Sequence, residues 1–138
     1  MVTEPALLAL QRATHATLHR LSTALRDLDL TASEINALGN LGDGQARTTS
    51  QLGVAVGAKP TTLTGVVDRL ERRGYITRTA SPTDRRATVI TTTTTGRRAA
   101  RRIRKAMTDL EQRAVADLPP ESIEAFHTVV TALTEERP

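Results

Sequence analysis

The spacing of apolar residues predicts that the chain is mainly helical. From residue 5 to residue 27, one stripe recurs every three or four positions, which is the pattern of a long helix with one buried face. Thr3 is a candidate N-cap for this helix, and Pro5 suits its first turn. The stripe consists of Leu7, Leu10, Thr14, Leu18, Leu21, Leu25 and Leu28.

Three shorter helices are predicted next, and each has a start or stop signal. The stretch "TASE" (residues 31–34) has the form of a capping box, and Thr48 with Gln51 could form a second one. The helix that follows this second box should stop at Gly57. A fourth helix is predicted to begin at Pro60, with its buried face formed by Leu63, Val66, Val67 and Leu70.

A β-hairpin is predicted after the fourth helix. Residues 75–80 and 88–93 are rich in β-branched side chains, which favour strands, and the "SPTD" between them (residues 81–84) favours a turn. Arg85 and Arg86 then lie at or near the tip. Because two exposed like charges repel one another and do nothing for a fold, this pair indicates a polyanionic neighbour.

Two further helices complete the predicted order of elements. One runs from about residue 93 to residue 117, and the pair Pro119–Pro120 starts the other. The last helix carries an apolar seam at steps of three and four residues, which is either monomer core or a dimer seam. We expect a dimer seam, because short segments leave little room to bury both end helices. Its residues are Ile123, Phe126, Val130 and Leu133.

The third and fourth predicted helices have the sequence form of a helix-turn-helix. They follow one another with no spare residues, Gly53 lies where two helices would approach most closely, and Gly57 lies where the turn needs positive φ. The exposed face of the second helix is rich in threonine, whose hydroxyl can bind phosphates or base edges and whose methyl can touch thymine. With the hairpin directly behind it, the whole forms a winged helix.

Charge is concentrated in the middle of the chain. The net charge is +4, but residues 47–105 hold 14 Lys/Arg and 3 Asp/Glu, whereas the remaining segments together have a balance of −7. Such asymmetry is typical of a polyanion-binding surface, although a solvated, salt-bridged face would also produce it. In the basic run of residues 97–105, we favour a solvated helix face over a contact with flanking DNA.

Composition excludes several classes of function. The sequence contains no cysteine, which excludes disulfides and thiolate metal sites, and no apolar run approaches the roughly 20 residues of a membrane span. No signal peptide is visible, so we expect a cytoplasmic protein with no membrane partner. A glycine-rich phosphate loop is absent and the three histidines lack an interpretable partner, so we expect no enzyme and no cofactor.

The sequence resembles the MarR family of bacterial transcription regulators along nearly its whole length. The resemblance rests on "LTASEINAL", "VVDRLERRGYITR", "SPTDRRATVIT" and "TTTGRRAAR". It implies a mainly α fold with a small β-hairpin wing: a single MarR-like domain over residues 1–138. Within it, a winged helix-turn-helix at about 31–92 is joined to dimerisation helices at about 4–28 and 94–136. A homodimer of this kind would bind an inverted-repeat site in double-stranded DNA.

The resemblance also implies roles for particular residues. Arg86 would enter the minor groove, Asp68 would pair with that arginine to position the wing, and Asp84 could orient one of the two tip arginines. We expect the dimer interface to include Leu7, Leu10, Ile123, Phe126, Val130 and Leu133. The predicted DNA-binding residues are Thr49, Lys59, Pro60, Thr61, Thr62, Thr64, Arg69, Arg78, Arg85 and Arg86.

Three positions depart from the family pattern. Gly65 stands where a polar or basic side chain is common, and a glycine inside a helix costs about 1 kcal/mol. Lys59 replaces a small hydroxyl cap, so the helix start depends on Pro60 and on phosphate contact. Thr92 replaces a leucine, which thins the packing beneath the wing.

We interpret the chain as a repressor that a small-molecule effector releases from DNA, with two alternatives. The winged helix could instead dock an acidic protein partner. His15 and His19, one helical turn apart, could bind a metal ion, with a third ligand supplied by folding; two histidines on a polar helix face are more often ordinary surface residues. The candidates for that third ligand are Glu4, Asp109 and His127.

Overall fold

The computed structural model describes residues 3–136 and divides into two compact units, one up to Met107 and one from Thr108 onward. The first unit contains α1 (Ala6–Ala24), a 3-10 turn η1 (Arg26–Leu28), α2 (Ala32–Asn40), the winged helix-turn-helix and most of α5 (Thr94–Ala114). The second unit contains the end of α5 and α6 (Glu121–Glu135). The mainly helical fold with a small antiparallel sheet is the one predicted.

The start of α1 differs from its prediction in one respect. Pro5 is the N-cap residue, and no side chain caps the helix, so the assignment of Thr3 as the cap is wrong. The leucine stripe of α1 is buried only toward its end, at Leu21 and Leu25, where the first unit has its core. The first turns of this helix are exposed.

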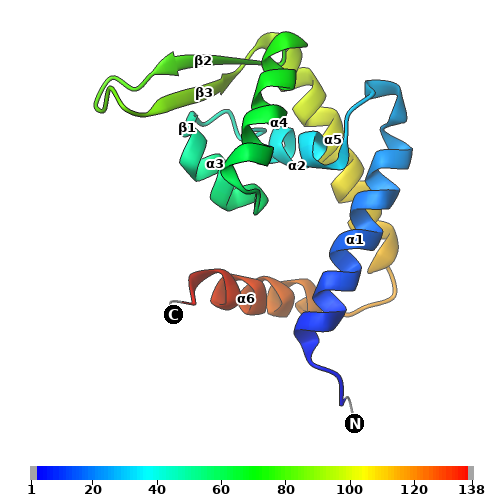
Figure 1. Ribbon diagram of the computed structural model, residues 1–138. Helices are drawn as coiled ribbons and strands as arrows, with labels where there is room; N and C mark the ends of the chain where they lie inside the picture. The colour runs from blue at the N-terminus through cyan, green and yellow to red at the C-terminus, as the bar shows by residue number, and fades with distance from the viewer. Residues whose placement is uncertain (1–2, 137–138) are drawn as a thin grey trace. The chain divides into compact units, whose positions relative to one another are not determined.

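The core of the first unit is formed by α2, α4 and the helices and strands packed around them (Figure 1). Every apolar residue that the pattern assigned to the buried face of α4 is buried, because these side chains share one face at the helical spacing of three and four. The largest fully buried side chains are Ile35, Leu38, Leu41, Leu52, Leu70, Ile76, Ile90 and Ile103.

The helix-turn-helix consists of α3 (Thr49–Val56) and α4 (Pro60–Arg72). A complete capping box starts α3, since the Thr48 side chain accepts from the Gln51 backbone and the Gln51 side chain accepts from the Thr48 backbone. Gly57 ends α3 with φ at 66°, as the turn requires. At Gly53, a Cβ would lie 3.1 Å from the Leu63 side chain, which explains why the helices can approach there.

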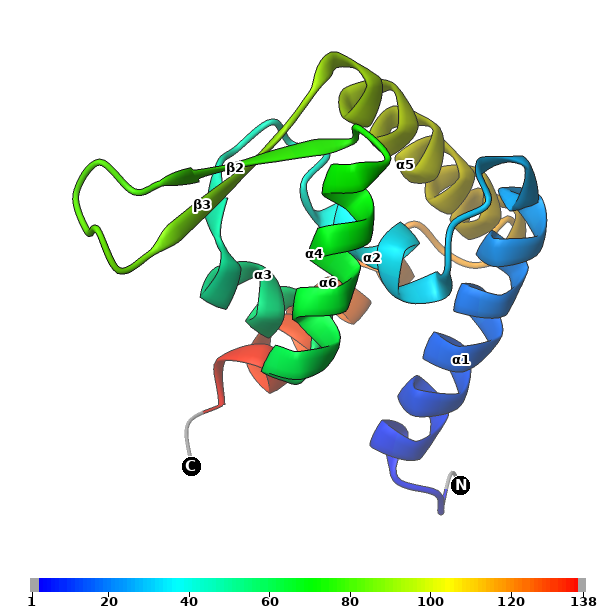
Figure 2. The same cartoon turned by 45° about the horizontal axis from the view of Figure 1, so that its top comes forward.

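The sheet has three antiparallel strands in the order β1–β3–β2, one more than predicted. Strands β2 (Ile76–Ala80) and β3 (Thr88–Thr92) form the hairpin, and β1 (Arg47–Thr48) pairs with the outer edge of β3. Figures 1 and 2 show the hairpin projecting beyond α3 and α4. Strand β1 thus joins the base of the wing to Thr48, the residue that caps α3.

A close junction joins the base of the wing to α5. Thr93 caps the helix, because its hydroxyl oxygen accepts from the Gly96 N–H at 3.0 Å while its hydroxyl donates to the Gly74 carbonyl at 2.6 Å. Gly96 packs directly on the backbone of Tyr75: a Cβ at Gly96 would lie 2.8 Å from the Tyr75 carbonyl carbon and closer still to its oxygen. Only a glycine fits at this position.

Candidate nucleic-acid interface

The first half of α4 presents a polar, exposed face. Pro60 occupies the first turn, and Lys59, Thr61, Thr62 and Thr64 are all exposed, as the pattern predicted. Lys59 is the N-cap residue, and no side-chain cap covers this helix start. The N–H groups of the first turn have no acceptor within a helix, so they remain available to an anion such as a phosphate.

Thr64 differs from the other two threonines in its hydrogen bonding. Its hydroxyl donates to the Pro60 carbonyl at 2.9 Å. What it offers a ligand is therefore a methyl group and oxygen lone pairs, not a donor. Thr49, the first residue of α3, is half-buried beside this surface.

Hydrogen bonds shape the wing tip. The Ser81 hydroxyl oxygen accepts from the backbone N–H groups of Thr83 and Asp84, and the Asp84 carboxylate accepts from the Arg86 N–H at 3.0 Å. The interaction of Asp84 with Arg86 is thus with the backbone, not with the guanidinium as expected. Arg85 and Arg86 are exposed on this ordered turn, so the turn displays both positive charges to the solvent.

Arg78 joins the wing to α4. Its guanidinium lies 2.9 Å from Asp68 and 2.9 Å from Glu71, both on α4. In this structure Asp68 pairs with Arg78, a residue of β2. The pairing of Asp68 with Arg86, which the family resemblance implies, stays a prediction. Arg78, predicted to contact DNA, is in this structure a link between two elements.

Arg69 is also anchored within the unit. Its Nε donates to Glu34 Oε1 at 2.8 Å, and Glu34 is only 2% exposed. Glu34 was expected to complete a capping box with Thr31; the Thr31 hydroxyl does accept from the Glu34 N–H, but the carboxylate pairs with Arg69 instead. This ion pair connects α2 to α4, and nothing in the local sequence indicates it.

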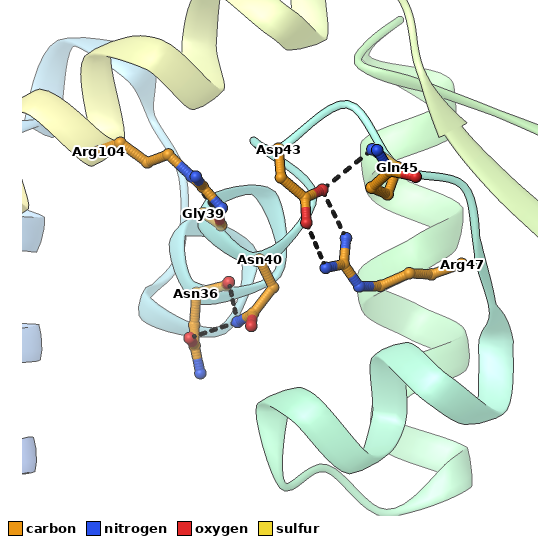
Figure 3. A network of polar contacts seen from close by, with 7 residues as sticks. All are labelled: Asn36, Gly39, Asn40, Asp43, Gln45, Arg47 and Arg104. Atoms are coloured by element: carbon orange, nitrogen blue, oxygen red, sulfur yellow. Dashed lines mark hydrogen bonds and ion pairs between the residues drawn. The ribbon is translucent and has the colours of Figure 1, made fainter. Parts of the chain in front are cut away.

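A polar network shapes the segment between α2 and α3 (Figure 3). The Asp43 carboxylate accepts from both terminal nitrogens of Arg47, at 2.9 and 2.6 Å, and from the Gln45 N–H. The hydrogen bond from Arg47 holds the pKa of Asp43 well below its usual range. Arg104 of α5 donates from Nε to the Gly39 carbonyl at 2.9 Å, which joins the end of α2 to α5.

Part of the basic run at residues 97–105 is engaged in contacts within the chain. Arg102 forms a bidentate pair with Asp27, at 2.8 and 3.0 Å, Arg97 donates to the Thr92 carbonyl, and Arg104 belongs to the network of Figure 3. Arg98 and Arg101 are exposed on α5.

The link between Arg78 and Glu71 predicts a measurable pH dependence. The hydrogen bond from Arg78 lowers the pKa of Glu71, so the link stabilises the fold above the ordinary glutamate pKa, and this contribution is lost as pH falls through the lowered value. Wild type should therefore be more stable than Glu71→Gln at pH 7, with the difference shrinking as the pH is lowered toward 3. Thermal unfolding of both proteins measures this.

The same comparison has a second arm at high salt. Because Glu71 and Arg78 are partly exposed, 1 M NaCl should screen most of the difference between the two proteins at pH 7. A difference that is constant with pH would contradict the role assigned to this pair.

Within residues 3–136, no group of three or more His, Cys, Asp or Glu side chains could hold a metal ion. His15 and His19 are exposed on α1, and Glu4 pairs with Arg12. Over the same residues, every helix is too short or too polar to cross a bilayer.

The residues predicted to form a dimer interface are accessible in the isolated chain. Leu7 is 51% exposed and Phe126 is 50% exposed, and α6 buries none of its residues. Leu10, Ile123 and Val130 are half-buried, and Leu133 is exposed. Large apolar side chains at this level of exposure leave apolar area that a second copy could cover.

Comparison with known proteins agrees with this geometry. The model of the MarR family matches residues 28–87, which span α2, the helix-turn-helix and most of the wing, including Arg85 and Arg86. A search of curated proteins found no match.

Several solved structures share the fold over nearly the whole chain. NadR in complex with 4-hydroxyphenylacetate has a TM-score of 0.88 at 17% identity, covering 99% of this chain and 98% of that one. MepR of S. aureus, in a DNA-binding conformation, has a TM-score of 0.83 at 22% identity and coverage of 94% and 96%. CouR of Rhodococcus jostii RHA1, bound to p-coumaroyl-CoA, has a TM-score of 0.83 at 19% identity and coverage of 99% and 96%. Residues 28–87, which carry α4 and most of the wing, thus match the model of the MarR family, and the solved structures show that the chain shares their fold.

Proposed function

We propose that this protein is a homodimeric regulator that binds a specific double-stranded DNA site, and that it represses transcription until a small molecule releases it. The observation that carries the proposal is the pairing of two exposed surfaces in one compact unit. One is the threonine-rich start of α4, and the other is the wing tip with Arg85 and Arg86. Together they offer groove-sized contact and the positive charge that phosphates require.

The predicted DNA contacts fall into two groups. Lys59, Pro60, Thr61, Thr62 and Thr64, with Thr49 and the two wing arginines, are proposed to touch DNA. Arg69 and Arg78 are proposed instead to position the contacting elements, because carboxylates of the same unit anchor both guanidinium groups. Removing either of them would displace α4 or the wing.

Different observations support dimerisation and release by a ligand. The exposed apolar residues of α1 and α6 favour a dimer, which would set two recognition helices on the halves of an inverted repeat. The structures of NadR and CouR each hold a small organic molecule, 4-hydroxyphenylacetate and p-coumaroyl-CoA respectively. A ligand of this chain would act by preferring a dimer conformation that does not fit DNA.

Selection of bound duplexes from a random DNA pool tests the proposal. We expect recovered sequences to share an inverted repeat whose half-sites are about one helical turn apart, because the protein would have two-fold symmetry. Recovery of a single, unrepeated half-site would contradict the dimer. Failure to enrich any sequence would contradict DNA recognition and favour an acidic protein partner.

A further inference from the structure

We infer that the recognition helix reads thymine methyl groups, so that each preferred half-site carries thymines opposite Thr61, Thr62 and Thr64. This inference rests on the proposed function, since it concerns which bases the same surface selects. It is carried by what the exposed part of α4 contains and by which polar side chains are already engaged elsewhere.

Base reading by a helix-turn-helix is done by the first residues of the second helix. The exposed residues there are the N-cap Lys59 and, in α4, Thr61, Thr62 and Thr64, because Leu63 is buried in the core. Gly65 follows with no side chain, and a Cβ there would meet only the end of the Arg69 side chain, at 3.4 Å. The base edges can therefore approach the threonines closely.

The side chain that most often reads guanine is arginine, through two N–H groups of its fork. The Arg69 Nε is committed to Glu34, and Arg73 donates to the backbone carbonyls of Leu28 and Asp29. Arg72 ends the helix, roughly 18 Å along the axis from Pro60 at 1.5 Å per residue. On α4, Arg69 is therefore tethered through its Nε to a buried carboxylate, which restricts how its two terminal nitrogens can reach a base.

The side chains that most often read adenine are asparagine and glutamine, which need both amide groups. Gln51, the only such residue on α3 or α4, uses its carbonyl oxygen to accept from the Thr48 N–H at 2.9 Å. That hydrogen bond caps α3, so breaking it to reach a base would weaken the helix start. Adenine recognition by this surface is therefore disfavoured.

The threonines remain, and Thr64 shows what they offer. Because its hydroxyl donates to the Pro60 carbonyl, Thr64 offers DNA its methyl group and its oxygen lone pairs. The methyl group can pack against the C5 methyl of thymine. Lys59 is a flexible point charge at the helix start, which suits a phosphate. We assign affinity to Lys59 and base selection to the three methyl groups.

The test replaces thymine by deoxyuridine, which differs only by the absent methyl, in a duplex recovered by the selection experiment. Each contacted thymine should lower the affinity about fourfold when it is replaced, because about one methyl group is no longer buried. Thr64→Ser keeps the hydroxyl and removes the methyl. In that variant, the thymine and uracil duplexes should bind equally at the position that residue 64 faces.

A matched control is available on α6. The Thr128 hydroxyl donates to the Glu124 carbonyl four residues earlier, as that of Thr64 does to Pro60, so Thr128→Ser makes the same chemical change outside the proposed DNA contacts. It should leave the difference between thymine and uracil as in wild type. Specific binding with no such difference in wild type would overturn the inference and leave the proposed function standing, whereas absence of any DNA binding would overturn both.

Discussion

Replacing Gly96 with alanine should destabilise the protein by at least about 3 kcal/mol, the largest effect we expect from a single methyl group. The added Cβ would lie 2.8 Å from the Tyr75 carbonyl carbon, and this neighbour is a backbone atom, which cannot swing aside as the end of a side chain can. The Tyr75 carbonyl also accepts from the Thr93 N–H at 3.0 Å. Relief of the clash would therefore pull the start of α5 away from the base of the wing. Chemical unfolding measures the effect.

Gly65→Ala is the matched control for that variant. Gly65 is also inside a helix, but the nearest atom to its added Cβ would be the flexible end of Arg69, at 3.4 Å. Alanine has the higher helix propensity, so this substitution should stabilise the protein by about 0.5–1 kcal/mol. If both alanine variants lowered stability equally, the close approach of Gly96 to Tyr75 would not be the reason.

Removing both wing arginines should weaken DNA binding by about 2–4 kcal/mol, or roughly 30- to 1,000-fold. Arg85 and Arg86 are exposed on a turn that is held by Ser81 and Asp84, so the double alanine variant should fold as wild type does. An arginine in a narrow minor groove gains from the strongly negative potential there. A fluorescence anisotropy titration with the selected duplex measures the loss, and circular dichroism checks the fold.

The control for this variant removes the same charge elsewhere. Arg98 and Arg101 are exposed on α5, so their double alanine variant loses two positive charges without touching the wing. We expect less than about a fivefold loss of affinity from weaker long-range attraction. Equal losses in the two variants would mean that affinity reports net charge alone, and the wing would have no special role.

The helix boundaries of the winged helix could be predicted because their signals are local. Thr48 and Gln51 cap α3 within four residues, Gly57 takes positive φ, and Pro60 starts α4, all as the sequence indicated. The strands β2 and β3 were predictable for the same reason, since β-branched runs flank one turn.

The features that escaped prediction depend on partners far away in the sequence. Strand β1 has only two residues, and it forms because Arg47 pairs with Ile90 of β3. No local sequence pattern predicts such a strand. The Glu34–Arg69 pair joins residues 35 positions apart. Glu34 had a plausible local role in a capping box, and the tertiary partner prevailed because a buried carboxylate needs an opposite charge.

In the candidate site, too, the features set by local sequence could be predicted and those set by distant partners could not. The exposed face of α4 follows from helical periodicity, so the positions of Lys59 and the threonines could be predicted. The pairing of Asp68 with Arg78 could not be predicted, because the sequence does not fix how the hairpin packs against α4.

The salt dependence of binding to duplex DNA tests the central claim most directly. Between 50 mM and 200 mM salt, we expect the affinity to fall on the order of a thousandfold, because contacts of Lys59 and the wing arginines with phosphates would release bound counterions. The slope of log affinity against log salt should be shallower by about four units in the variant that lacks Arg85 and Arg86, because a dimer loses both arginines from each of its two subunits. Affinity that does not change with salt, or no binding at all at 50 mM, would contradict the account.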